Sequence, residues 1–352
     1  MITLAGIHQP RGRESSWPRS GGGRRIAGVN LTSLRHRAEY LAVRVLFCVL
    51  QTLRIETCAA LARRAARFCT DVLKLRADVP AENLAIAYPH WTEAERRACI
   101  LRMWEHLFLF VAEVAQSPRK IRITNYRRYV TFREEADFAR VMYDDRPTIF
   151  LTAHFGAFEM LGYFAGMVGI PSYTIVRTLD NPYLEAFLAR FRGATGQHLI
   201  AKEGASDRIA DVLRQGHLLG ILADQYAGSK GSWVKFFGKS ASTHKAVALL
   251  ALTEGARLIV ATVRRDGGPM QYVETFHAEF DPRTATTEAT NPTAITQWFT
   301  DEFERFIRDD PSQYWWLHRR WKDNRKERAA KKRAAAAAAA GTEGRRGGEA
   351  ER

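Results

Sequence analysis

The sequence predicts an α/β fold: a mostly parallel central sheet flanked by helices, preceded by an N-terminal helical segment. Two observations predict it. From Pro147 onward, short apolar runs alternate with helical stretches, which is typical of parallel strands joined by helices. Before that point, apolar residues recur at helical spacing over residues 38–75 and 92–116. With 352 residues, 46% of them hydrophobic, the chain can form one large or two smaller domains with a packed core.

Charge separates the ends of the chain from its body. The formal net charge is +15, but residues 1–37 contribute +6 and residues 319–352 contribute +7, so the body is nearly neutral. We therefore expect four regions, in order: a disordered basic extension, an N-terminal helical region, a domain built on the sheet, and a disordered basic, Ala-rich tail. Their bounds are 1–28, 29–118, 119–322 and 323–352.

The helical region contains the most apolar stretch of the chain, residues 41–55. Arg44 and Arg54 interrupt it, so it falls short of the ~18 uninterrupted apolar residues that a spanning helix needs. A helix of this kind, flanked by arginines, can lie in a membrane interface or pack on the protein's own core, and this segment alone favours neither. Thr92 and Glu95 form a capping-box pair that predicts the start of the next helix.

The sheet domain is expected to alternate strands and helices. The predicted strands cover residues 148–153, 172–176, 217–223, 257–264 and 270–280. The predicted helices include one that ends at Gly169 and others over 182–192, 207–214, 243–254 and 294–308. In open α/β sheets, ligands bind beyond the carboxyl ends of the strands, so the residues after each run indicate the site.

Polar residues follow three of the predicted strands. His154 comes after the first, with Glu159 five positions further on; Arg177 follows the second, and Asp224 and Gln225 follow the third. We expect the side chains of His154, Arg177, Asp224 and Gln225 to open into one crevice.

His154 and Glu159 are the residues best suited to catalysis. Imidazole takes a proton near neutral pH, and a carboxylate partner holds its tautomer and stabilises the imidazolium. Glu159, across a glycine-containing turn, is predicted to reach back to one ring nitrogen of His154. The G-x-S-x-G pattern of a nucleophilic serine is absent, so the base is expected to activate a substrate hydroxyl. An isolated H-x4-E pattern is more often an incidental histidine and glutamate at the start of a helix.

A set of further motifs along the chain favours the catalytic interpretation of His154 and Glu159. The segment Thr152–Met160 resembles the H-x4-(D/E) block of the bacterial lysophospholipid acyltransferase superfamily, and the rest of the chain resembles the late acyltransferases of lipid A biosynthesis, the lauroyl/myristoyl transferase family. The other segments that carry the resemblance are Asn83-Leu84, Tyr88-Pro89, Arg177-Thr178-Leu179-Asp180-Asn181-Pro182, Leu213-Arg214-Gln215-Gly216, Ala223-Asp224-Gln225, Lys235-Phe236-Phe237-Gly238 and residues 311–322.

The resemblance implies a glycerolipid acyltransferase-like fold over about residues 38–322, with residues 119–322 as the acyltransferase domain. It also implies acyl transfer from acyl carrier protein, or from coenzyme A, to a glycolipid hydroxyl at the cytoplasmic face of the bacterial inner membrane. Many members have a true spanning helix at the N-terminus, whereas the counterpart here is short and interrupted by arginines. We therefore expect the helical residues 29–118 to be a membrane-associating region, with peripheral or monotopic attachment to an anionic membrane surface.

The remaining site residues have two readings each. Arg177 is the candidate donor to the oxyanion, or a structural ion pair. Asn181 reads first as a helix N-cap and second as a substrate contact. Asp224 and Gln225 either orient a substrate or stabilise their loop.

The stretch between Gln225 and Thr253 contains no acidic residue. With its glycines it suits a flexible loop whose Lys230, Lys235 and Lys239 bind anionic substrate groups, although these lysines can equally be solvated surface. Two sets of apolar residues can either serve a site or simply pack in the core. Leu161, Phe164 and Met167 can form the wall of an acyl channel, and Trp315, Trp316 and Trp321 can be interfacial anchors.

No cofactor or metal is expected. The four cysteines form no C-x-x-C pair and no zinc spacing, so we expect free, mostly buried thiols in a reducing cytosol. Gly238-Lys239-Ser240 imitates the end of a P-loop, but Trp233 stands where the first glycine is needed, which argues against nucleotide binding. No apolar segment follows the first basic residues, so no signal peptide is expected.

Three hypotheses of function remain. The first is an acyltransferase that acts on a lipid A precursor or related glycolipid, or, with the same chemistry, on another lysophospholipid or glycosylated lipid. The second is a nucleic-acid-binding protein that uses its arginine-rich ends; the near-neutral body argues against nucleic acid as a partner. The third is a non-catalytic membrane adaptor.

Overall fold

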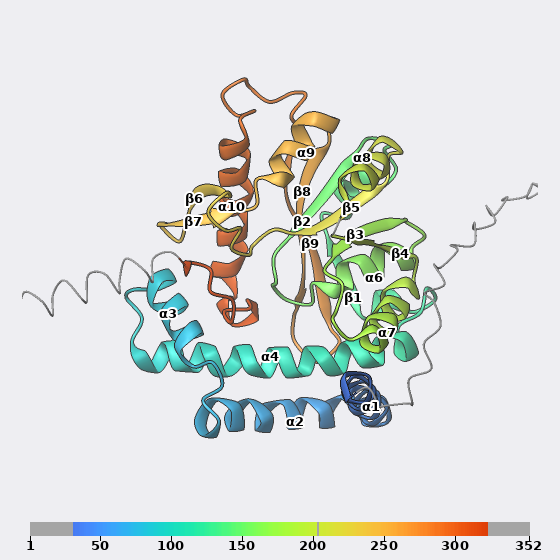
Figure 1. Ribbon diagram of the computed structural model, residues 1–352, viewed down its shortest axis with the longest axis vertical. Coiled ribbons are helices and arrows are strands. Elements are labelled where there is room, and N and C mark those ends of the chain that lie inside the picture. The colour runs from blue at the N-terminus through green and yellow to red at the C-terminus, as the bar shows by residue number, and fades with distance from the viewer. Residues whose placement is uncertain (1–30, 203, 323–352) are drawn as a thin grey trace, which may run out of the picture.

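A seven-stranded sheet forms the centre of the computed structural model, which describes residues 31–202 and 204–322 (Figure 1). The predicted extension 1–28 and tail 323–352 lie outside the described residues. The strands are β1 (Val130–Arg133), β2 (Thr148–Thr152), β3 (Ser172–Val176), β4 (Gln197–Ala201), β5 (Leu218–Leu222), β8 (Arg257–Arg265) and β9 (Tyr272–Phe280), and a separate hairpin pairs β6 (Ser232–Phe236) with β7 (Lys239–Thr243).

The order across the sheet is β1-β9-β8-β2-β5-β3-β4, and five adjacent strands, β8 to β4, are parallel. β9 runs antiparallel to β8, and β1 runs parallel to β9. The prediction of a mostly parallel α/β sheet is therefore confirmed.

Helices cover both faces and one edge of the sheet. They are α1 (Leu31–Thr52), α2 (Ile55–Arg67), α3 (Asp78–Ala87), α4 (Glu93–Lys120), α5 (Glu135–Met142), α6 (Glu159–Met167), α7 (Pro182–Gly193), α8 (Ser206–Arg214), α9 (Ala246–Glu254) and α10 (Pro292–Asp309). Along β2 the side chains alternate: Phe150 packs with residues of α5 and α6, whereas Ile149 and Leu151 pack with residues of α8, α9 and α10. All five side chains of β2 are buried, as a central parallel strand covered on both faces requires.

The N-terminal helices form a layer at the carboxyl edge of the sheet. Helix α4 passes across this edge in Figure 1, and α1 and α2 pack on its other side. The predicted capping box at Thr92 and Glu95 is present. Helix α1 contains no buried residue, although its Leu50, and Leu53 just after its end, pack against the core. Within the described ranges, no helix combines the length and the apolar composition that a membrane span requires.

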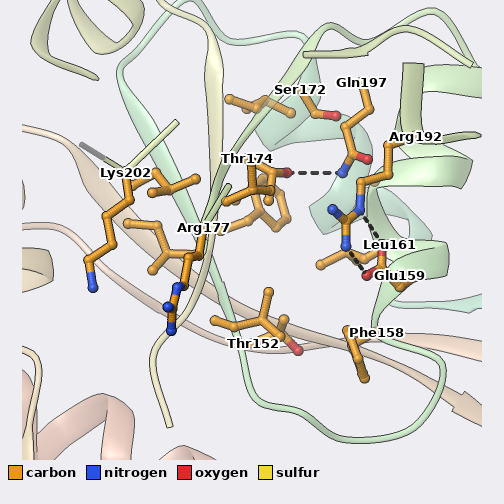
Figure 2. A pocket seen from close by; sticks show the side chains of 18 of the residues that line it. Thr152, Phe158, Glu159, Leu161, Ser172, Thr174, Arg177, Arg192, Gln197 and Lys202 are labelled. Carbon is orange, nitrogen blue, oxygen red and sulfur yellow. Dashed lines mark hydrogen bonds and ion pairs between the residues drawn. The ribbon is translucent and has the colours of Figure 1, made fainter. Parts of the chain in front are cut away.

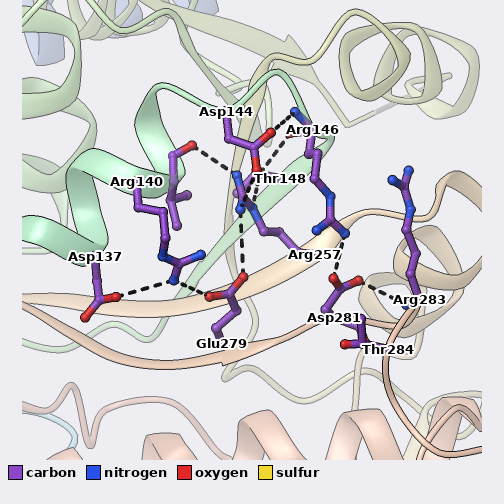
Figure 3. Close-up of polar contacts among 11 residues, drawn as sticks. Asp137, Arg140, Asp144, Arg146, Thr148, Arg257, Glu279, Asp281, Arg283 and Thr284 are labelled. Atoms are coloured by element: carbon purple, nitrogen blue, oxygen red, sulfur yellow. Dashed lines mark hydrogen bonds and ion pairs between the residues drawn. The ribbon is translucent and has the colours of Figure 1, made fainter.

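The opposite, amino edge of the sheet is held by ion pairs (Figure 3). The buried guanidinium of Arg257 donates to the Thr148 hydroxyl and to the Val141 carbonyl, and it forms an ion pair with Asp144 at 2.9 Å. These contacts tie the starts of β2 and β8 together, so the charges at this edge are accounted for by the fold.

Several elements were not predicted, and one prediction was wrong. The stretch between Gln225 and Thr253, expected to be a flexible loop, contains the β6–β7 hairpin, with Phe236 and Ala241 buried. Its turn consists of Phe237 and Gly238, both with positive φ, as a two-residue hairpin turn requires. Because a phenylalanine occupies a position that asparagine or glycine usually takes, the turn signal was hidden. The sequence analysis also missed α3, α5, β1 and the edge strand β4.

Candidate active site

The turn between β2 and α6 positions His154. Gly156, two residues later, has a φ of +59°, and a Cβ at this position would lie 2.2 Å from the Val263 carbonyl oxygen, so only glycine fits. The Ala157 N–H donates to that same oxygen, and the Trp315 N–H donates to the His154 carbonyl. The backbone that carries the imidazole is therefore fixed by two other segments of the chain.

The partner of His154 is Asp224. The imidazole Nδ1 lies 2.7 Å from Asp224 Oδ1, and the His154 backbone N–H donates to Oδ2 at 3.1 Å. This pairing follows from the sheet, since Asp224 follows β5 and β5 lies beside β2 with Thr152 opposite Leu222. In the neutral ring Nδ1–H donates a hydrogen bond to this carboxylate, which leaves Nε2 unprotonated. The side-chain amide of Gln225 lies 3.3 Å from Nε2.

Asp224 also controls the charge of this pair. Burial lowers the pKa of His154, but the charge and hydrogen bond of Asp224, with a smaller contribution from Glu159, more than offset it, so the pKa is raised above its ordinary value. The reverse holds for Asp224: burial raises its pKa, but the charge and hydrogen bonds of His154 lower it to about 2. Asp224 is therefore ionised at neutral pH and stabilises a protonated imidazole.

The predicted contact between His154 and Glu159 is wrong. Glu159, the first residue of α6, accepts two hydrogen bonds from Arg192 of α7, at 2.9 and 2.6 Å (Figure 2). The physical reason is that Asp224 already occupies Nδ1, and a fork-shaped guanidinium is the better partner for a free carboxylate. Glu159 lines the same cavity as His154, and its negative charge contributes to the raised pKa of the imidazole.

The cavity opens where two strands separate. β3 pairs with β5 only as far as Thr174 and Gly220, whereas β2–β5 and β3–β4 remain paired to their ends. A cavity of about 570 Å³ occupies this opening, and His154 and Gln225 lie on its wall.

Residues on both faces of the sheet line this cavity. On the α6 face they include Phe150, Leu161 and Gly220, and on the α8–α9 face they include Ile175, Ile209 and Val247. Most of these walls are apolar, which suits a hydrocarbon chain. Of the three residues considered for an acyl channel, only Leu161 lines the cavity; Phe164 is buried in the core, and Met167 packs against the core cluster that contains it.

The other predicted site residues divide into two groups. Arg177 lines the mouth of the cavity, as expected, and Lys202 at the end of the neighbouring strand β4 lies there too, with its N–H on the Val176 carbonyl. Figure 2 shows both side chains across the cavity from the Glu159–Arg192 pair. Lys230, Lys235 and Lys239 are not among the residues that line the cavity, because they belong to the hairpin and the loop before it.

Asn181 is a helix N-cap, the first of its two readings. Its side-chain oxygen accepts from the backbone N–H groups of Tyr183 and Leu184, and its amide donates to the His36 carbonyl and to Glu39 of α1. Its hydrogen-bonding groups are thus occupied by the fold, which argues against the substrate contact.

Sequence reasoning missed Arg192 and Lys202. Arg192 gave no signal, because its partner lies in a different helix. Lys202 could have been found by the same strand-end rule, had β4 been recognised.

Of the three tryptophans, Trp316 and Trp321 are buried in the core, whereas Trp315 is 37% exposed and its ring meets the His154 ring edge-to-face at 5.4 Å. The described residues contain no cluster of histidine, cysteine and acidic side chains that could hold a metal ion. The four cysteines are free; three are buried and Cys48 is exposed.

Comparison with known proteins agrees with this geometry. The family model of bacterial lipid A biosynthesis acyltransferases matches residues 29–323. The chain is 25% identical over 257 residues to the lipid A biosynthesis lauroyltransferase of Escherichia coli, covering 71% of this chain and 80% of that protein. It is 25% identical over 240 residues to a lipid A biosynthesis acyltransferase of Haemophilus influenzae, covering 67% and 72%. It is also 22% identical over 267 residues to the lipid A biosynthesis palmitoleoyltransferase of Escherichia coli, covering 74% and 84%.

Proposed function

This chain belongs to the bacterial lipid A biosynthesis acyltransferase family, and from that premise we propose that it transfers a fatty acyl group from a thioester to a hydroxyl of a lipid A precursor or related glycolipid. The observation that supports this most directly is the His154–Asp224 pair on the wall of an apolar cavity. A base, a carboxylate that holds its tautomer, and room for a fatty chain are what direct acyl transfer to a hydroxyl requires.

His154 acts as the general base in this mechanism. Its Nε2 takes the proton of the acceptor hydroxyl while the hydroxyl oxygen attacks the thioester carbonyl carbon. The tetrahedral intermediate then collapses, the carbon–sulfur bond breaks, and the thiolate takes the proton back from the imidazolium. Asp224 stabilises the imidazolium between these two steps, and Glu159 adds negative charge to the same cavity.

The oxyanion of the intermediate needs a donor. The Gln225 amide lies 3.3 Å from Nε2, beside the place where the thioester carbonyl must lie during attack. We propose that this amide donates the hydrogen bond to the oxyanion. Arg177, a permanent cation at the mouth of the cavity, stabilises the developing negative charge from further away. Arg177 and Lys202 together also favour a phosphate-bearing donor, either acyl carrier protein or coenzyme A, or an acceptor that carries phosphate.

The acceptor is expected to reach the site from a membrane surface. Helix α1 exposes Leu41, Val45 and Val49, and it packs against α7, whose Leu188 lines the cavity. A basic helix with exposed apolar residues suits an interface rich in anionic lipid. We propose a peripheral position at the cytoplasmic face of the inner membrane, with the mouth of the cavity facing the lipid.

A transfer assay tests this function. The full-length protein is incubated with acyl carrier protein and coenzyme A thioesters, separately, and with either a lipid A precursor or a lysophospholipid in mixed micelles. Transfer to the lipid A precursor, lost in His154→Ala, is the expected result. Transfer only to the lysophospholipid would favour the alternative acceptor, and transfer to neither acceptor from either donor would contradict the proposal.

The two other hypotheses have their own readouts. A nucleic-acid-binding protein would lose its affinity when residues 1–28 and 325–352 are deleted, whereas the acyltransferase should stay active. An adaptor would keep its phenotype in His154→Ala. Mass spectrometry of the lipids of a deletion strain would identify the acceptor in the cell.

A further inference from the structure

Gly156, in the turn that carries His154, is held through both its N–H and its carbonyl. The Gly156 N–H donates to the Gln313 carbonyl at 3.0 Å, and the Gly156 carbonyl lies 3.0 Å from Nε2 of His106, a buried residue of α4. His106 is not among the residues that line the cavity, so nothing in the mechanism above uses it.

The tautomer of His106 follows from its second neighbour. Its Nδ1 lies 2.8 Å from a guanidinium nitrogen of Arg265. Because arginine only donates hydrogen bonds, Nδ1 must accept, and the ring proton is on Nε2. His106 therefore donates to the Gly156 carbonyl. Burial and the charge of Arg265 lower the pKa of His106 to about 3, so this arrangement persists at any working pH.

Arg265 is itself held by Glu113, which lies about two turns after His106 on α4. Two nitrogens of Arg265 donate to the two carboxylate oxygens of Glu113, which is fully buried and also accepts from the Met270 N–H. Gln313 completes the connection, since its side chain binds both the N–H and the carbonyl of Arg265. Burying these groups is expensive, and a hydrocarbon core would serve stability as well. The turn that carries His154 is where their hydrogen bonds converge.

We propose that His106, oriented by Arg265 and Glu113, is a positioning residue that helps to fix the Gly156–Ala157 peptide and with it the orientation of the His154 ring. This inference rests on the proposed function, because it takes His154 as the base. The Ala157 N–H of this peptide also donates to the Val263 carbonyl, so His106 supplies one of its two hydrogen bonds. Without His106 the Gly156 carbonyl loses its donor, the peptide can tilt about the remaining bond, and Nε2 of His154 moves relative to the thioester. A misplacement of the base by about an ångström lowers turnover by up to ~100-fold.

Two substitutions at one position separate positioning from packing. His106→Ala removes the donor. His106→Gln restores both functions, because the amide N–H reaches the Gly156 carbonyl and the amide oxygen accepts from Arg265. We expect His106→Ala to lower kcat by ~10-fold to ~100-fold with KM unchanged, and His106→Gln to recover most of the loss. The control is His217→Ala, the same substitution at a histidine that stacks on Tyr173 away from the catalytic turn.

Rates are compared per folded molecule, with the folded fraction taken from circular dichroism melts. The ring ¹⁵N spectrum of His154 is recorded in parallel: it should change in His106→Ala and return towards the parent in His106→Gln. Where His106→Ala does not fold, Arg265→Lys replaces the three nitrogens that bond His106 and Glu113 by a single ammonium and leaves His106 in place, and it should lower kcat less.

Parental kcat and a parental His154 spectrum in His106→Ala would overturn the proposal, and so would equal impairment of the alanine and glutamine variants. The failure of the proposed function is a separate result, because a parent without transfer activity still shows whether the His154 spectrum depends on His106.

Discussion

His154 and Asp224 are 70 residues apart in the chain, yet the aspartate holds both the ring and the backbone of the histidine. One carboxylate oxygen accepts from Nδ1 and the other from the backbone N–H. A rotation of the ring away from Asp224 would therefore break one bond while the other keeps the turn in place. This two-point contact makes Asp224, together with His154, one of the two residues whose loss should affect catalysis most.

Asp224→Asn should lower kcat by ~10³-fold to ~10⁴-fold, because an amide presents an N–H where the Nδ1 proton must be accepted and so favours the wrong tautomer. His154→Ala, for comparison, should lower it by ~10²-fold to ~10⁴-fold. In the parent, activity should fall on the acid side as Nε2 is protonated, at a pH above the ordinary value for histidine, because Asp224 raises the pKa of His154. In Asp224→Asn that limb should move to lower pH. A pH profile of kcat/KM measures both effects, and an unmoved acid limb would contradict the assignment.

Glu159 and Arg192 should shift the same profile in opposite directions. The charge of Glu159 contributes to the raised pKa of His154, and Arg192 neutralises part of that charge. Glu159→Gln should therefore move the acid limb to lower pH, and Arg192→Met, which leaves the carboxylate unpaired, should move it to higher pH. The double variant should resemble Glu159→Gln. Equal shifts in the two single variants would mean that the pair acts only through the fold.

Much of the site could be predicted because the strand-end rule depends only on where apolar runs stop. That rule brought His154, Arg177, Asp224 and Gln225 to one edge of the sheet, and the structure gathers them there. The wrong partner for His154 came from proximity in the sequence, which favoured Glu159. The neighbour relation of β2 and β5 is a property of the sheet order, and β3 and β4 come between them in the chain.

The elements that were missed share a physical cause. Charged or hydroxyl side chains make up two of the five residues of β6 and four of the five residues of β7, so their run is not apolar enough to be recognised. Strand β4 is at the edge of the sheet and only partly buried. The contact of His106 with Gly156 depends on how α4 crosses the sheet, which no local pattern in either segment indicates.

Gly220 should limit the length of acyl chain that the cavity accepts. It lies on β5 on the α6 face of the cavity, and a Cβ there would meet its nearest neighbour at 3.4 Å, an ordinary contact. Gly220→Val is therefore expected to fold, with its methyl groups in the cavity. The preferred thioester should become shorter, and kcat/KM for the original chain should fall by at least ~10-fold. Gly268→Val, at a position with open space around it in the β8–β9 turn, is the control. An unchanged chain-length profile would mean that the acyl chain does not pass Gly220 and lies against the α8–α9 side of the cavity instead.

Glu274 should make the stability of the protein depend on pH. It lies on β9 and lines the cavity, and burial raises its pKa to about 8. In the unfolded chain the same carboxyl ionises near 4.5, so between these values the unfolded state releases a proton that the folded state keeps. The contribution of this group to stability is complete below about pH 4.5, declines as the pH rises, and is constant again above about pH 8. Glu274→Gln, which cannot ionise, should remove this dependence. Melting temperatures of parent and variant are measured from pH 5 to pH 9. Relative to the parent, the variant should gain stability as the pH rises, and a constant difference between the two across this range would show that the carboxyl is ionised in the folded protein.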